Sequence, residues 1–143
     1  MCKFFFFISL QVIFRFNQYT SLSDVDSKVA SVNLLEGYSN AHEALTLCNS
    51  VLFAGNGAGR KRVLIALMAG RSTVSLTTAA ITLKTAKVKV IAVGMGSSFS
   101  NQELITMAYS STYALYSNSF TGLAGKRQPV SNLVSEGKRY NNE

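Results

Sequence analysis

The chain has 143 residues, which is enough for one domain with a buried core and too few to expect two. Its apolar fraction of 48%, with one proline and ten glycines, excludes a disordered or fibrous polypeptide. The formal net charge is +7, but the basic residues are scattered and no basic helix face accompanies them. We therefore expect most of them to lie in solvated loops, and we expect no nucleic-acid partner.

The amino-terminal segment has two interpretations that both stay open. Lys3 followed by the apolar residues 4–9 is similar to a secretory signal, but no small-x-small cleavage site follows it cleanly. The run is too short, and too soon interrupted by Gln11 and Arg15, to span a bilayer, so no transmembrane segment is predicted. Its aromatic and β-branched content favours two strands, at residues 4–9 and 12–16.

Two helices are predicted next. Residues 21–32 form a short helix with Ser23 as its cap and valines on one side. Residues 41–53 form an amphipathic helix, and Asn40 followed by Glu43 resembles a capping box at its start. The inward face of this second helix comprises small and aliphatic side chains, namely Ala44, Leu45, Cys48, Val51 and Leu52.

Cysteine usage leaves the cellular compartment open. Cys2 and Cys48 allow at most one disulfide, and their spacing is not that of a metal site. Cys48 falls on the apolar face of a predicted helix, where a buried thiol is the common outcome.

Residues 61–96 are predicted to form a βαβ unit around which the chain is organised. Two apolar runs, at residues 63–68 and 88–93, flank a helical pattern at residues 76–86. The unbroken first run predicts a strand buried on both faces of a parallel sheet. Binding sites in such sheets lie where the strands end, which here means residues 68–72 and 94–98.

The remaining elements continue this alternation. Ser100 and Glu103 form a capping box for a helix at residues 102–108, a third strand follows at 112–116, and residues 121–137 contain a last helix starting near Pro129. Strands alternating with helices predict an α/β fold with a doubly wound, mostly parallel sheet and helices on both faces. Residues 1–137 form one domain, and 138–143 form a polar tail.

Catalytic motifs are weak throughout the sequence. Gly94-x-Gly96 is placed between a strand and a helix, where a nucleotide would bind, but a third glycine and an acidic ribose partner are missing. The glycines at residues 55–59 precede a strand, which is the wrong place for a phosphate loop. His42 is the only histidine, and no nucleophile and orienting acid are arranged around it. We do not expect an enzyme.

Five segments in order resemble the von Willebrand factor type A (vWA) domain, also seen as the inserted domain of integrins. Residues 37–40 resemble its Gly-Gly-Thr-Asn-Thr loop, and residues 62–72 resemble its Val-Leu-Ile-x-x-Thr-Asp-Gly-x-Ser strand and loop. Residues 88–96 resemble Val-x-Val-x-Ala-Val-Gly-Val-Gly. The other two segments are residues 12–19, which resemble a hairpin strand, and the pair Glu103-Leu104.

The departures from this family concern its metal site. Family members usually begin with a strand carrying Asp-x-Ser-x-Ser, and no such segment occurs here, so the chain resembles an amino-terminally truncated domain without the first strand and helix. The family's threonine ligand corresponds to Ser39, and its second aspartate corresponds to Ala69, which cannot ligate a cation. Arg71 would repel one. The resemblance implies a degenerate metal-ion-dependent adhesion site (MIDAS) and no metal or other cofactor.

The resemblance also implies a function. It implies a protein-interaction or adhesion domain of the extracellular matrix or cell surface, extracellular or secreted, with a protein partner such as collagen or another matrix protein. The loops at the strand ends are expected to form a partner-binding rim comprising Tyr38, His42, Arg71 and Ser72. Two alternatives stay open: a small nucleotide-binding α/β enzyme, and a non-functional fragment of a longer vWA protein.

Overall fold

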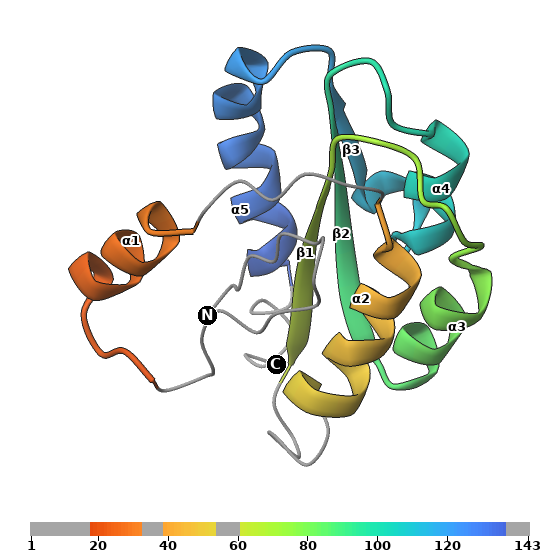
Figure 1. The fold of residues 1–143 in the computed structure, drawn as a ribbon, viewed down its shortest axis with the longest axis horizontal. Helices are drawn as coiled ribbons and strands as arrows, with labels where there is room; N and C mark the ends of the chain where they lie inside the picture. The colour runs from red at the N-terminus through yellow and green to blue at the C-terminus, as the bar shows by residue number, and fades with distance from the viewer. Residues whose placement is uncertain (1–17, 33–38, 54–60, 137–143) are drawn as a thin grey trace.

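A parallel sheet forms the centre of the structure, a computed structural model that describes residues 18–32, 39–53 and 61–136. Its strands are β1 (Arg62–Met68), β2 (Val88–Met95) and β3 (Ala114–Ser117), in the order β1-β2-β3, and both pairings are parallel (Figure 1). The predicted parallel βαβ unit is confirmed. The strands predicted at 4–9 and 12–16, the glycines at 55–59 and the tail at 138–143 lie outside the described residues.

Helices cover both faces of the sheet, as the doubly wound prediction requires. One side has α2 (Ala41–Leu47) with its continuation η1 (Cys48–Phe53), α3 (Thr77–Thr85) and α4 (Asn101–Met107), whereas α5 (Arg127–Ser135) lies on the other (Figure 1). The first helix, α1 (Leu22–Ala30), stands apart from the sheet, and none of its residues is buried. No helix among the described residues is long and apolar enough to cross a membrane.

The core lies between the sheet and these helices. β2 is the central strand and is buried along nearly its whole length, because helices cover it on both faces and a strand flanks it on each side. The helix predicted at residues 76–86 has one face directed to the core, on which Leu76, Ala79, Ala80 and Leu83 are buried and Ala86 is half-buried. Within the described part of the chain β1 pairs only with β2.

The strands end at one level. Met68 on β1 pairs in register with Gly94 on β2, and Met95 pairs with Ser117 on β3. The connections that follow each strand therefore leave the sheet from a common carboxyl edge, which is where parallel sheets place their binding loops.

One predicted helix cap is wrong, and the helix predicted at 41–53 is confirmed with a change in its winding. The cap of α1 is Ser21 and not Ser23, because Ser21 has extended backbone angles and its hydroxyl accepts a hydrogen bond from the Asp24 N–H. The helix predicted at 41–53 changes to a wider π-helical winding at Cys48. Hydroxyls within this helix bond to the carbonyl oxygens four residues earlier, a contact that accompanies such distortions.

The carboxyl-terminal elements differ from the prediction in their bounds. A 3-10 turn at Ser111–Tyr113 delays β3 by two residues. A second 3-10 segment, Thr121–Lys126, leads directly into α5, so this helix starts before Pro129. Proline is tolerated at the third position of α5, since the first N–H groups of a helix have no partner within it.

Candidate functional site at the carboxyl edge of the sheet

The loop from β1 to α3 forms the middle of the carboxyl edge, and the start of α2 holds it on one side. The Thr73 backbone N–H donates to the Ser39 carbonyl oxygen at 3.0 Å, and the Thr73 hydroxyl donates to the same oxygen at 3.2 Å. His42 Nδ1 lies 2.9 Å from the Ser75 carbonyl oxygen. Because a carbonyl oxygen only accepts hydrogen bonds, Nδ1 is the protonated nitrogen of His42.

The start of α4 holds the same loop on its other side. The Ser72 backbone N–H donates to Glu103 Oε2 at 3.0 Å. Ser100 is the cap of α4, as predicted, since its hydroxyl accepts from the Glu103 N–H at 3.4 Å. The Glu103 carboxylate, however, accepts its hydrogen bond from the β1–α3 loop. The predicted capping box does not include this contact.

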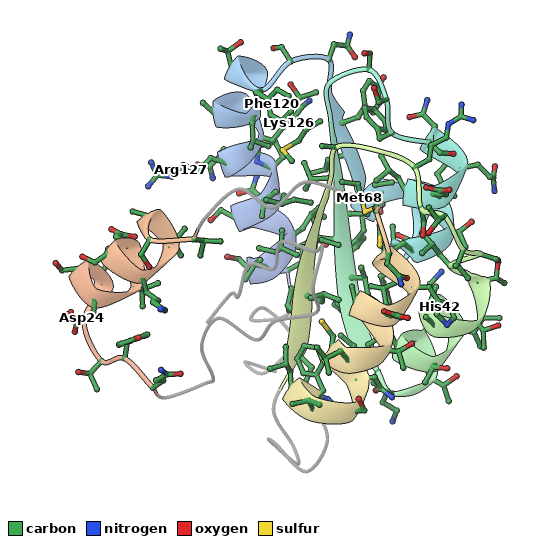
Figure 2. All side chains as sticks on the ribbon, in the orientation of Figure 1. Asp24, His42, Met68, Phe120, Lys126 and Arg127 are labelled. Atoms are coloured by element: carbon green, nitrogen blue, oxygen red, sulfur yellow. The ribbon has the colours of Figure 1, made fainter. Side chains whose placement is uncertain are left out.

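These hydrogen bonds bring together most of the predicted rim. Ser39 and His42 lie on one flank of the β1–α3 loop, Ser72 lies within it, and Arg71 next to Ser72 is exposed to solvent. In Figure 2, His42 lies on α2 on the side that faces α3. Tyr38, the remaining predicted rim residue, lies outside the described residues.

Among the residues that the structure describes, no set of oxygen donors at this edge is arranged to hold a divalent cation. Ala69 is exposed and its methyl group offers no oxygen. The carboxylate of Glu103 accepts a backbone N–H, and Ser39 uses its carbonyl oxygen for Thr73. Among residues 18–32, 39–53 and 61–136, no group of three or more His, Cys, Asp or Glu side chains is arranged to hold a metal ion. Magnesium and similar ions prefer several oxygens that include carboxylates, so these residues do not fit one.

The two glycines at the end of β2, Gly94 within the strand and Gly96 just after it, have packing roles. A Cβ atom on Gly94 would lie 2.6 Å from side-chain atoms of both Leu104 and Phe99. Gly96 has a φ of +79°, and its N–H donates to the Ser117 carbonyl oxygen at 2.9 Å. The space above Gly94 is filled by side chains and the Gly96 amide is used within the sheet, so this loop is not arranged as a phosphate cradle.

The bond between Glu103 and Ser72 gives a testable contribution to stability. We expect Glu103→Ala to lower the free energy of unfolding by about 1–2 kcal/mol, because a half-buried N–H loses a charged acceptor. Urea unfolding followed by circular dichroism measures this loss, and hydrogen exchange at the Ser72 amide should become faster. Gln102→Ala, at the exposed neighbouring position, is the control and should change the free energy by less than about 0.5 kcal/mol. Equal losses in both variants would contradict this role of Glu103.

The fold and the arrangement of this edge define a class of protein. The sequence model of the von Willebrand factor type A domain matches residues 9–128. The chain therefore belongs to the von Willebrand factor type A domain family, and the family expectation drawn from its sequence segments is confirmed.

Solved structures agree with this assignment. The fold is similar to that of proximal thread matrix protein 1 from the mussel byssus, with a TM-score of 0.78 and 24% sequence identity over 85% of this chain and 31% of that one. A structure of the same mussel protein with a zinc-occupied MIDAS motif gives the same values. The likeness shows the fold, and this chain spans about a third of the matched chains' length. A comparison with curated protein sequences gives no match.

Proposed function

We propose that this chain is a protein-interaction domain of the adhesion type, which binds its partner through the carboxyl-edge rim without a metal ion. Membership of the vWA family supports an interaction role, and it supports the absence of enzymatic activity. The observation that carries the proposal is the β1–α3 loop, held by Ser39 and His42 on one flank and by Glu103 on the other.

A loop held on both flanks is suited to binding because little of its conformational freedom remains to be lost. Ordering a flexible loop on association costs free energy, and a loop already ordered avoids this cost. Arg71 is an exposed side chain near the centre of this loop, and a guanidinium with five N–H donors fits carboxylate and carbonyl oxygens of a protein partner. We assign Arg71 the main contact and propose His42, Ser72 and Tyr38 as further contact residues.

The proposed partner is a protein of the extracellular matrix, such as collagen, and the proposed location is extracellular. The similar mussel protein is described as a matrix protein of the byssus, which supports a matrix setting for this chain. We further propose that residues 1–137 form a single partial vWA domain and that residues 138–143 form a polar tail.

Binding to immobilised matrix proteins tests this function. Biolayer interferometry against collagen, fibronectin and laminin should show saturable binding to one of them, with the same affinity in EDTA and in Mg²⁺. Arg71→Ala should weaken binding about tenfold, the effect of removing a central interface residue. Lys87→Gln, at an exposed cation that precedes β2 at the opposite edge of the sheet, is the matched control and should bind like the unchanged chain. Binding that requires Mg²⁺, or no binding to any of the three, would overturn the proposal.

The proposed loss of the metal site has its own prediction. A ligand that binds only the folded state stabilises it by RT ln(1 + [L]/Kd), about 2.7 kcal/mol at a hundredfold excess over Kd. We expect Mg²⁺ or Mn²⁺ to leave the thermal unfolding midpoint unchanged, because Ala69 provides no ligand and Glu103 is already bonded to Ser72. Ala69→Asp alone should also bind no Mg²⁺ tightly, since one added carboxylate does not complete the set. Micromolar Mg²⁺ affinity, measured by calorimetry in the unchanged chain or in Ala69→Asp, would contradict the proposed loss of the metal site.

A further inference from the structure

A second surface, which the rim does not include, lies beside β3. It is formed by three aromatic and two basic residues that follow β2, lie on β3 or connect β3 to α5, and we name it the aromatic–basic surface. Figure 2 shows Phe120 and Lys126 on the connection that leads from β3 to α5, and Arg127, the first residue of α5, on the outer side of that helix. The members of this surface are Phe99, Tyr116, Phe120, Lys126 and Arg127.

Contacts link Phe99, Tyr116 and Lys126, Phe120 covers the neighbouring Gly96, and Arg127 follows Lys126 directly in the chain. The rings of Phe99 and Tyr116 have centroids 6.5 Å apart. Lys126 Nζ lies 5.9 Å from the centroid of the Tyr116 ring, which is within the range of a cation–π contact. Phe120 lies over Gly96, where an added Cβ atom would be 3.8 Å from its ring. The surface thus extends from the loop after β2, across β3, to the start of α5.

Two of the three aromatic side chains of this surface are open to solvent, whereas Phe99 is half-buried. Phe120 is 66% exposed and Tyr116 is 57% exposed. Large aromatic side chains dominate the energetics of protein interfaces because they bury much area for few rotatable bonds. Two exposed rings near a lysine are therefore the kind of surface that a binding partner covers.

The charge around this surface selects the kind of partner. The sequence contains no Asp or Glu between Glu103 and Glu136, and within this stretch Lys126 and Arg127 are the only charged residues. A partner segment with carboxylates would therefore meet positive charge and no opposing negative charge from this stretch. Single-stranded nucleic acid also combines charge with stacking, but it requires a positively charged groove along its backbone, and two adjacent cations do not provide one.

We propose that the aromatic–basic surface binds an acidic segment of a protein partner, with an apolar side chain of that segment against Phe120 and Tyr116 and its carboxylates at Lys126 and Arg127. This contact involves none of the residues assigned to the rim.

Fluorescence anisotropy with labelled probes tests this inference on the full chain. The probe is a short fluorescein-labelled peptide of glutamate, leucine and glycine. Its counterparts are the same peptide with lysine in place of glutamate, and a labelled oligouridylate. We expect saturable binding of the acidic peptide alone, weakened by added salt because the charges are exposed. Phe120→Ala and Lys126→Gln should each weaken binding of the acidic peptide about tenfold. Arg71→Ala should leave this binding unchanged.

Two control variants test whether peptide binding depends on this surface rather than on any exposed apolar side chain or any exposed cation. Ile81→Ala removes a side chain that is 58% exposed on α3, and Lys87→Gln removes an exposed cation at the other end of the sheet. Both should bind the acidic peptide like the unchanged chain. The thermal midpoint should change little in any variant, because Lys126 is half-buried at the surface and the other substituted side chains are exposed. Equal weakening by the control variants, tighter binding of oligouridylate, or no saturable binding of the acidic peptide would overturn the proposal. These results leave the matrix-binding test of Arg71 unaffected, so the two proposals fail separately.

Discussion

Leu83→Ala is expected to lower the free energy of unfolding by about 3 kcal/mol, the typical cost of removing a buried leucine side chain. Leu83 lies in α3 and has no exposed surface. The helix packs against β2, α2 and α4, so atoms surround the leucine from several elements that cannot all move into the space left by an alanine. The cost therefore includes both the lost transfer free energy and the remaining cavity.

A variant on the same helix is a close control for this prediction. Ile81 is two residues away in α3 and is 58% exposed, so Ile81→Ala should change the free energy of unfolding by less than about 0.5 kcal/mol. Both substitutions end in alanine, so their difference reports burial rather than helix propensity. Chemical unfolding in urea measures both values. Similar losses in the two variants would mean that α3 does not pack on the sheet as described.

The central βαβ unit could be predicted because its signals are local. Residues 63–68 and 88–93 are apolar runs, and the four-residue spacing of buried α3 residues is readable from the sequence alone. Caps are also local: Asn40 and Ser100 both accept a hydrogen bond from the third residue after them, as predicted. Ser21 and Ser23 are both good caps by type, and only the backbone angles decide between them.

The contacts between loops could not be predicted, because they join residues far apart in the chain. His42 contacts the Ser75 carbonyl oxygen across 33 positions, and Ser72 contacts Glu103 across 31. Neither pair has a sequence pattern, since any carbonyl or N–H at the right place would serve. The sequence did predict that these loops share an edge, because parallel strands end together.

The aromatic–basic surface was missed for a different reason. Tyr116 lies in a short apolar segment that predicts a strand, and aromatic residues in strands are usually interpreted as core. In the structure β3 pairs only with β2 among the described residues, and Tyr116 points to solvent. Exposure at the end of a sheet depends on where the sheet stops, which local sequence does not encode.

Raising the pH should destabilise this protein through Cys48. The thiol is buried at the start of η1, and this burial raises its pKa from 9.0 to about 12. In the unfolded chain the thiol loses its proton near pH 9.0, whereas in the folded protein it keeps the proton until about pH 12. The unfolded state therefore binds fewer protons in this window, so stability is fully present below pH 9.0 and falls as pH rises. Each pH unit in the window costs about 1.4 kcal/mol, which gives about 2–3 kcal/mol at about pH 11.

The contribution of Cys48 to the pH dependence of stability has to be separated from that of other groups that titrate in the same range. Burial and the hydrogen bond to Glu136 also raise the pKa of Tyr113, so this tyrosine contributes a loss of the same sign. Comparing the chain with Cys48→Ala cancels that contribution, since Tyr113 is present in both. Both proteins carry Cys2→Ser and are unfolded in urea with reductant at about pH 8 and about pH 11. The decrease in the free energy of unfolding between these pH values should be about 2–3 kcal/mol smaller in Cys48→Ala than in the chain that keeps Cys48. Parallel losses in the two proteins would show that the Cys48 thiol is not shielded from water, because only a buried thiol keeps its proton at a pH where the unfolded chain has lost it.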